Sequence, residues 1–235
     1  VVMGMALWGT VVGALFGSFP TQRLGRKTTL FWIGVLYTIS AVGSALSNYP
    51  IVFAVFRFIG GLGVGISTIA APAYISEIAP PKDRGRLVGL YQFNLVFGIL
   101  LAFLSNYLLS DIGDNAWRWM MGVEAFPAIL FTLLCLTIPK SPRWLITRGL
   151  VDEAKAIYAK VDPNGSFDQL LQEINQSVTS ENKSESIFNK KYRFPLKLAF
   201  LVAFFNQLSG INAFLYYAPR IFEEGGLGES ASLLS

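Results

Sequence analysis

Long apolar runs separated by short polar loops dominate the chain. Six such runs can be drawn, covering residues 1–19, 28–46, 51–75, 87–109, 119–138 and 196–218. Each has about 20 residues, the length that an α-helix needs to cross the roughly 30 Å hydrocarbon core of a bilayer. None alternates between apolar and polar positions as a β-barrel strand would. The pattern therefore predicts an all-α polytopic membrane protein with six transmembrane helices.

The composition agrees with this prediction and excludes a soluble globule. Of the 235 residues, 53% are apolar and 14% are charged, whereas soluble domains carry about 25% charged residues. The net charge is +4, and basic residues are concentrated in every second loop, at 20–27, 80–86 and 139–148. Basic loops mark the cytoplasmic side of a membrane protein. We therefore expect the first helix to run from outside to inside, with the lipid bilayer as a partner and no nucleic acid.

One long polar stretch interrupts the pattern between residues 139 and 195. Apolar residues at helical spacing predict one helix within 144–160 and another within 167–178. The loop charges place this insert in the cytoplasm. The chain then divides into five transmembrane helices (1–138), a cytoplasmic helical linker (139–195), and a further transmembrane helix with an outer loop (196–235). Because the chain opens inside an apolar run, we expect it to be an internal piece of a longer membrane protein.

Few residues are suited to catalysis or to metal binding. The chain has no histidine, which removes the usual general base and the commonest metal ligand. Cys135 is the only cysteine and lies inside an apolar run, so neither an internal disulfide nor a cysteine-based metal site can form. We therefore expect no enzyme activity, no cofactor and no metal.

The last apolar run carries polar side chains where a lipid-facing helix would carry leucine. Asn206, Gln207 and Asn212 supply carboxamides, and Tyr216 and Tyr217 supply phenols. An uncompensated polar group is costly in hydrocarbon, so such groups face protein, water or a ligand. A carboxamide both donates and accepts hydrogen bonds, which suits an uncharged solute covered with hydroxyl groups. This run therefore indicates a path for a sugar-like solute.

The first apolar run carries glycines at every fourth position. Gly9, Gly13 and Gly17 fall on one face of a helix, where the missing side chains let a second helix approach closely. We therefore expect this helix to pack tightly against a neighbour.

Short motifs accompany these features in a definite order. The order and spacing resemble the sugar porter family of the major facilitator superfamily, with this chain matching helices two to seven of the family. The amide motif near the end, combined with Ser-Pro-Arg and the helical insert, is the specific part, since Arg-rich loops occur in many carriers. The motifs are Arg23-Leu24-Gly25-Arg26-Lys27, Gly60-Gly61, Pro72-Ala73-Tyr74, Arg84-Gly85-Arg86, Trp117-Arg118-Trp119, Pro139-Lys140-Ser141-Pro142-Arg143-Trp144-Leu145 and Gln207-Leu208-Ser209-Gly210-Ile211-Asn212-Ala213.

The resemblance implies alternating access around a midplane site, with a cytoplasmic charge network that stabilises one state. Arginine–carboxylate pairs at helix ends can break and re-form as the halves of a carrier rotate. The alternative is ordinary loop charge, in exposed pairs that contribute about 0–1 kcal/mol each. Gln22 and Lys140 depart from the family pattern, which usually has Asp or Asn and Glu there. The network falls on Arg26, Lys27, Glu77, Arg84, Glu124 and Arg143.

For the solute, the resemblance implies contacts from side chains in two of the predicted helices. On a straight helix Gln207 and Asn212 would point about 140° apart, so a bend at Gly210 is needed to turn both toward one cavity. The alternative role of these amides is hydrogen bonding between helices. The implied contacts are Gln92, Asn206, Gln207, Asn212 and Tyr216.

Arg57 is the one charge well inside a predicted span. Charge within a membrane is costly and is normally paired. In proton-coupled members of the family the matching arginine works with an aspartate on the first helix. Arg57 is therefore either a proton-coupling residue or a charge that reaches back to the outer interface.

These features favour a carrier that moves neutral monosaccharides by alternating access, either as a proton symporter or as a uniporter. One alternative is a carrier for another small organic solute, but such a carrier would need basic or aromatic residues in its cavity. The other is a sugar sensor that binds without transporting. The short insert and lean loops favour a multi-pass protein of a bacterial inner membrane.

Overall fold

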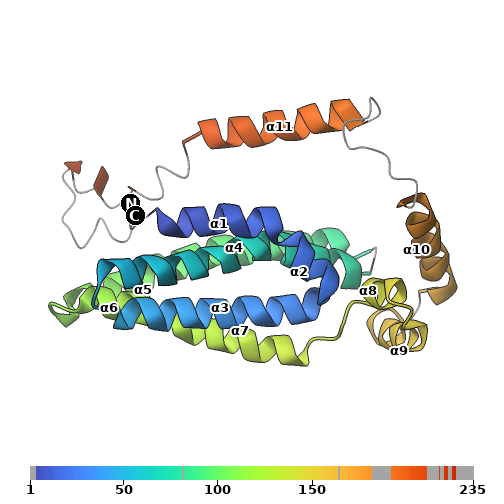
Figure 1. The fold of residues 1–235 in the computed structure, drawn as a ribbon, viewed down its shortest axis with the longest axis horizontal. Helices are drawn as coiled ribbons and strands as arrows, with labels where there is room; N and C mark the ends of the chain where they lie inside the picture. Colours follow the sequence, from blue (N-terminus) through green and yellow to red (C-terminus); the bar gives the residue numbers. More distant parts are fainter. Residues whose placement is uncertain are drawn as a thin grey trace.

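The structure is a computed structural model that describes residues 4–80, 82–163, 165–181 and 192–210, together with positions 217, 220, 221, 224 and 225. All regular structure in these residues is helical (Figure 1). The helices are α1 (Met5–Phe16), α2 (Ser18–Arg23), α3 (Arg26–Leu46), α4 (Pro50–Ile78), α5 (Arg84–Leu109), α6 (Ala116–Val123), α7 (Ala125–Thr137), α8 (Pro142–Thr147), α9 (Val151–Val161), α10 (Phe167–Glu181) and α11 (Arg193–Leu208), with a short 3-10 helix, η1, at Ser110–Ile112.

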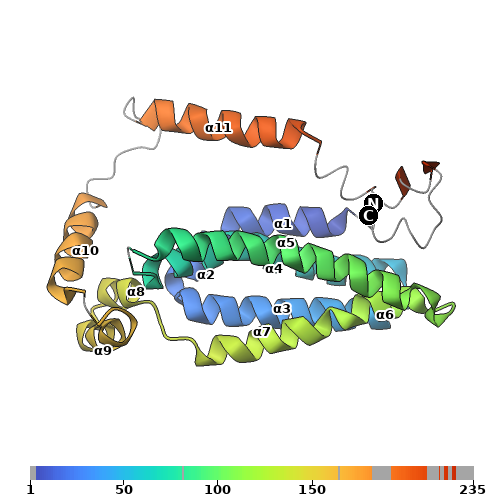
Figure 2. The same ribbon diagram turned by 180° about the vertical axis from the view of Figure 1, so that it is seen from behind.

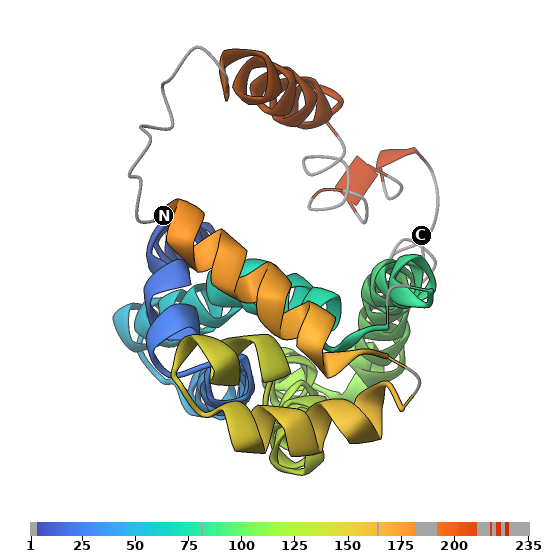
Figure 3. The same ribbon diagram turned by 90° about the vertical axis from the view of Figure 1, so that its right-hand side faces the viewer.

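The helices form one elongated bundle with a helical group at one end. α1, α3, α4, α5 and the α6–α7 pair lie side by side (Figures 1 and 2). α4 contacts both α1 and α3, and α3 also contacts α6 and α7, so α3 and α4 are central to the packing. α8, α9 and α10, here called the insert, gather at one end of the bundle. α11 stands apart from the bundle on the side of α1 (Figures 1 and 3).

Within the described residues, four helical segments are long and apolar enough to cross a membrane. They are Arg26–Leu46, Pro50–Ile78, Arg84–Ile112 and Ala116–Thr137, and they confirm the second to fifth predicted spans. The first span is divided, with α1 ending at Phe16 and α2 following it. Pro20 explains the break, because it has no N–H for the carbonyl four residues earlier and its ring crowds that carbonyl.

The sixth predicted span is interrupted as well. α11 ends at Leu208, and Gly210 has a φ of +73°, a left-handed conformation that glycine adopts without steric cost. The chain therefore leaves the helix direction at the glycine where a bend was expected. Asn212 and Tyr216 lie outside the residues that the structure describes.

α1 and α4 approach each other along a strip of glycines. A Cβ atom on Gly9 would overlap the carbonyl oxygen of Phe58, and one on Gly61 would overlap a carbonyl oxygen of α1. Gly13 and Gly65 make a similar contact one turn further along. Small residues permit this backbone approach between membrane helices, so the tight packing expected from the glycine spacing is confirmed.

Apolar surface covers the outside of the bundle, and the buried core is small. α5 contains no buried residue although it is rich in leucine and phenylalanine. A helix that is apolar on all sides suits lipid or other membrane helices as neighbours. The buried cluster between α3, α4 and α7 comprises Leu30, Ile33, Ala70 and Cys135.

The insert packs around a core of its own. The single helix predicted within 144–160 is in fact two, because Gly149 with a φ of +77° turns the chain between α8 and α9. The second predicted helix corresponds to α10. The buried residues of this core are Leu145, Ile146, Ala154 and Ile174.

Candidate functional site

A largely buried ion pair lies where the bundle meets the insert. Arg26 is the first residue of α3 and Glu77 is in the last turn of α4, and their side chains are 18% and 9% exposed. Arg26 Nη2 lies 2.7 Å from Glu77 Oε1. Ser141, the residue that caps α8, donates from Oγ to Glu77 Oε2 at 2.6 Å. One carboxylate thus ties together two bundle helices and the insert.

The burial of this pair makes it sensitive to loss of either partner. Removing one member of a buried ion pair strands an uncompensated charge and costs about 3–5 kcal/mol. Arg26 is already imperfectly satisfied, since its Nε is buried without a hydrogen-bond partner. Its Nη1 donates only a long bond, 3.4 Å, to the carbonyl of Thr21. Glu77 therefore provides most of the compensation for the Arg26 charge.

A second set of contacts attaches the insert to the turn between α2 and α3. Trp144 donates from Nε1 to the carbonyl of Gln22 at 2.8 Å. Arg148 donates from Nη2 to the carbonyls of Arg23 at 2.8 Å and Gln22 at 3.2 Å. The indole packs on Gly25, whose φ of +86° a residue with a side chain rarely adopts. At position 22 the contacts use the backbone, so they do not depend on the side chain that departs from the family pattern.

The sequence did not single out Ser141, Trp144 or Arg148 as site residues. Two signals could have found them. Ser141 precedes Pro142, and a serine followed by a proline is a common N-cap and first-turn pair at the start of a helix. This pattern places the Ser141 hydroxyl at the helix end. Trp144 is a large aromatic residue in a polar stretch, and such a residue usually packs against a partner.

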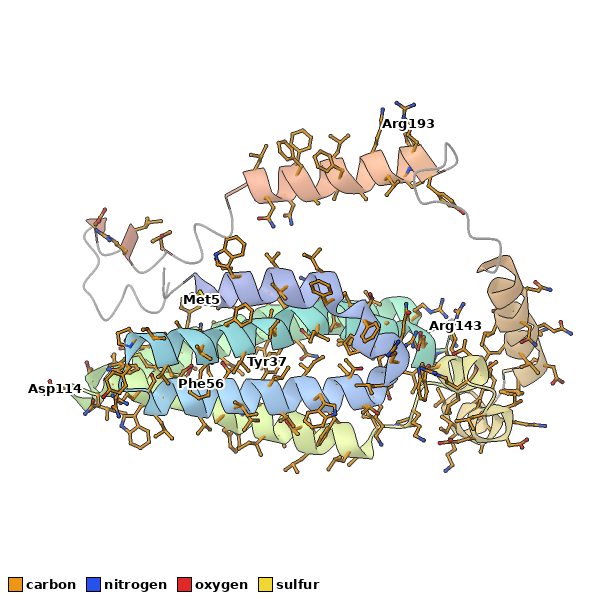
Figure 4. The ribbon with its side chains drawn as sticks, in the orientation of Figure 1. Met5, Tyr37, Phe56, Asp114, Arg143 and Arg193 are labelled. Carbon is orange, nitrogen blue, oxygen red and sulfur yellow. The ribbon has the colours of Figure 1, made fainter. Side chains whose placement is uncertain are left out.

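The other basic residues of the expected network have different surroundings. Lys27 donates from Nζ to the carbonyl of Leu136 at 2.8 Å, at the end of α7. Arg143 is exposed at the end of the bundle where the insert begins (Figure 4). Within the described residues neither Arg84 nor Arg143 forms an ion pair. Lys140, the second departure from the family pattern, pairs with Glu153 of α9 at 2.9 Å, with both side chains more than 40% exposed.

Arg84 lines a polar cavity of about 160 Å³ between the bundle and the insert. Glu77, Asp162 and Glu173 contribute carboxylates to the same cavity. Tyr158 also lines it, and burial raises the pKa of this phenol, with the neighbouring Asp162 raising the pKa further. The phenol therefore stays neutral and donates to Asp162 Oδ2 at 3.4 Å. Arg84 has acidic neighbours on both the bundle and the insert.

Another ion pair connects α4 to the junction of α6 and α7, far from the Arg26–Glu77 pair. Arg57 Nη1 is 3.9 Å from Glu124 Oε2, with side chains 33% and 53% exposed. The same nitrogen is 3.8 Å from the sulfur of Met121. Both charged residues line a cavity of about 500 Å³ between α1, α3, α4 and α7, which also contains the polar side chains of Tyr37 and Ser40.

This position sets Glu124 apart from the other residues predicted for the cytoplasmic network. Arg57 and Glu77 are twenty positions apart on one helix, so at 1.5 Å per residue they are separated by about 30 Å. Glu124, next to Arg57, cannot reach Glu77. It sits at the break between α6 and α7, where Pro127 cannot donate to the carbonyl of Val123.

The expected sugar contacts are not brought together by the described residues. Gln92 is exposed on α5, and Asn206 and Gln207 are exposed on the last turn of α11. The backbone carbonyl of Asn206 accepts from Ser209 Oγ at 2.6 Å. Since α11 stands apart from α5 (Figure 3), Gln92 and Gln207 do not line a common cavity here, and their roles stay predictions.

Comparison with known proteins decides the family. The sequence model of the family described as "Sugar (and other) transporter" matches residues 1–235. This chain belongs to that family. The sugar transporters are carriers of the major facilitator superfamily and not enzymes, as expected from the absence of catalytic residues.

Individual relatives and structures give the same assignment. The D-xylose-proton symporter of Escherichia coli K12 is 35% identical over 97% of this chain and 52% of its own length. The arabinose-proton symporter of Bacillus subtilis is 34% identical over 100% of this chain and 52% of its own length. The solved structure of the proton:xylose symporter XylE bound to 6-bromo-6-deoxy-D-glucose superposes with a TM-score of 0.87 at 35% identity, covering 99% of this chain and 54% of that one. The chain thus spans about half the length of these relatives.

Proposed function

We propose that the protein containing this chain carries a monosaccharide across the membrane by alternating access, coupled to a proton. The observation that carries the proposal is the Arg57–Glu124 pair, whose nearest charged atoms are 3.9 Å apart and whose residues both line a cavity of about 500 Å³. Ionisable residues at membrane depth are costly and mark ion or substrate pathways. Relatives named as xylose-proton and arabinose-proton symporters support the same reading.

The pair offers a simple mechanism for coupling. While Glu124 is ionised, it attracts Arg57 and holds α4 against the α6–α7 junction. When Glu124 takes a proton, the attraction is lost and Arg57 is free to find another partner. A ligand shifts a conformational equilibrium only by its differential affinity for the two states, and here the proton would be that ligand.

The junction of bundle and insert supplies the second element of the proposal. Arg26, Glu77 and Ser141 join α3, α4 and α8 through two short contacts, and Arg84 lies close to further carboxylates. Ion pairs at helix ends re-form in new combinations when rigid parts of a protein rotate. We place this junction on the cytoplasmic side of a bacterial inner membrane, as the basic loops and the bacterial relatives suggest.

Proton coupling is tested with Glu124→Gln in the full-length protein, reconstituted in vesicles. We expect proton-driven accumulation of xylose or arabinose to fall by about tenfold or more, within the usual range of coupling between sites. Sugar counterflow, which needs no proton gradient, should persist. Glu153→Gln, which removes an exposed carboxylate of the insert, is the matched control. Accumulation at the wild-type level in Glu124→Gln would refute the coupling role.

Sugar contact is tested separately with Gln207→Ala. A carboxamide that binds a hydroxyl contributes about 1 kcal/mol or more, so the apparent KM should rise about five- to tenfold. Uptake of xylose, arabinose, glucose and inositol should be compared, because a relative at 33% identity is named a probable inositol transporter. Gln172→Ala, in an exposed part of α10, is the control. An unchanged KM for all four solutes removes Gln207 from the site.

A further inference from the structure

A third cavity lies at the end of the bundle remote from the insert. It has a volume of about 520 Å³ and opens between the end of α3 and the start of α6. This side of the bundle faces away from α11 (Figures 1 and 3). None of the ion pairs described above contributes to it. The lining residues are Ala45, Leu46, Asn115, Arg118, Trp119 and Gly122.

From the ends of the apolar helices, we expect the cavity to lie at the level where lipid head groups meet the hydrocarbon core. Leu46 is the last residue of one membrane-crossing helix, and Asn115 directly precedes another. Aromatic residues gather at this depth in membrane proteins. Trp119 is 61% exposed at the cavity, and Trp117 beside it packs edge-on against Phe53 with ring centroids 6.1 Å apart.

Hydrogen bonds hold Arg118 in place at the cavity and leave some of its N–H groups available for a ligand. Its Nη1 donates to the carbonyl of Ala45 at 3.0 Å, at the end of α3, and its Nη2 donates to Asn48 Oδ1 at 2.9 Å. The guanidinium carbon lies 4.6 Å from the ring centre of Trp117. A guanidinium has five N–H groups, so donors remain, and within the described residues Arg118 has no carboxylate partner.

We propose that this cavity binds the phosphodiester of a membrane phospholipid, with the phosphate on Arg118 and an acyl chain along Leu46, Trp119 and Gly122. Arginine binds phosphate oxygens through short charge-assisted hydrogen bonds. The apolar lining and the interface depth select a phospholipid over free phosphate. Asp114, in the connection that leads into α6 (Figure 4), and Asp111, in η1, reduce the positive charge at this end of the bundle. A head group with a single phosphate therefore fits better than a polyanionic one.

The site has a structural consequence that does not depend on sugar transport. The lipid would join the end of α3 to the start of α6, which already share the Arg118 hydrogen bonds. Arg118 would then connect two helices and the bilayer, at the end of the bundle opposite the Arg26–Glu77 junction.

The location is tested with a photoactivatable phosphatidylglycerol, carrying a diazirine in one acyl chain, on the full-length protein in vesicles. We expect crosslinks in residues 45–46 and 115–122, with competition by unlabelled phosphatidylglycerol. Diacylglycerol with the same chains, which lacks the phosphate, and inorganic phosphate should not compete. Crosslinks confined to other parts of the protein, or equal competition by diacylglycerol, overturn the proposal.

Two variants test the two halves of the site independently. Arg118→Gln removes the charge. In native mass spectrometry, the first phosphatidylglycerol molecule should bind to this variant about tenfold more weakly than to the wild-type protein. Gly122→Leu keeps the Arg118 charge and adds a side chain to the cavity lining, where a Cβ meets only Ala45 Cβ at 3.5 Å. It should weaken binding as well. Lys155→Gln, an exposed charge of the insert, should change nothing. If Arg118→Gln fails to fold, Gly122→Leu decides, and wild-type lipid affinity in that variant refutes the site.

Discussion

Replacing Glu77 with leucine should lower the free energy of unfolding by about 3 kcal/mol or more. The change leaves Arg26 buried, with its side chain only 18% exposed and its ion-pair partner gone. It also removes the acceptor of the 2.6 Å hydrogen bond from Ser141. Unfolding of the full-length protein in detergent, followed by circular dichroism against denaturant, measures the loss.

The double variant Arg26→Leu with Glu77→Leu separates the stranded charge from the rest of the effect. Replacing both members of a buried pair with apolar residues is often close to neutral. We therefore expect the double variant to recover most of the stability that Glu77→Leu loses. Lys140→Leu, which breaks an exposed pair, should change stability by less than about 1 kcal/mol. If Glu77→Leu behaves like Lys140→Leu, the buried pair does not support the fold.

Gly61→Ala should also destabilise the protein, by about 1–3 kcal/mol. The added methyl group would overlap a carbonyl oxygen of α1. Because the obstacle is backbone and not a flexible side chain, relief requires α1 and α4 to separate. The two helices would then lose contacts along the whole glycine strip. The same detergent unfolding experiment measures the effect.

Gly122→Ala is the matched control, since it adds the same methyl group to a helix that has room for it. Its Cβ would meet Ala45 at 3.5 Å, an ordinary contact. Alanine is favoured over glycine in a helix by up to about 1 kcal/mol, so this variant should be neutral or stabilised. Equal effects of the two changes would show that the glycine strip has no special role in packing.

The charged residues show how far sequence reasoning reached at the site. Arg26 and Glu77 were selected as network residues, and they are 2.7 Å apart. Glu124 was grouped with them and is instead next to Arg57. The run 119–138 contained a signal, because Glu124 lies five residues inside it, about 8 Å along a helix. Glu77, by contrast, follows the end of its own run, at the opposite side of the bundle.

The long apolar runs by themselves determined the helical membrane architecture. A backbone in hydrocarbon must satisfy its hydrogen bonds in a helix or in a closed barrel, and runs of about 20 apolar residues without alternation fit only the helix. The glycine spacing in the first run likewise determined a close helix contact, since three small residues on one face leave no side chain to hold a neighbour away.

Only the tertiary structure decided which polar groups meet. The attachment of Trp144 and Arg148 to the α2–α3 turn spans more than 120 positions of sequence, and no local pattern encodes it. The placement of Arg118 beside Ala45 and Asn48 likewise depends on how α3 and α6 are rotated about their axes. Local hydrophobic periodicity dictates that a helix forms and which face is apolar, whereas the partner of each buried charge is set by the packing of whole helices against one another.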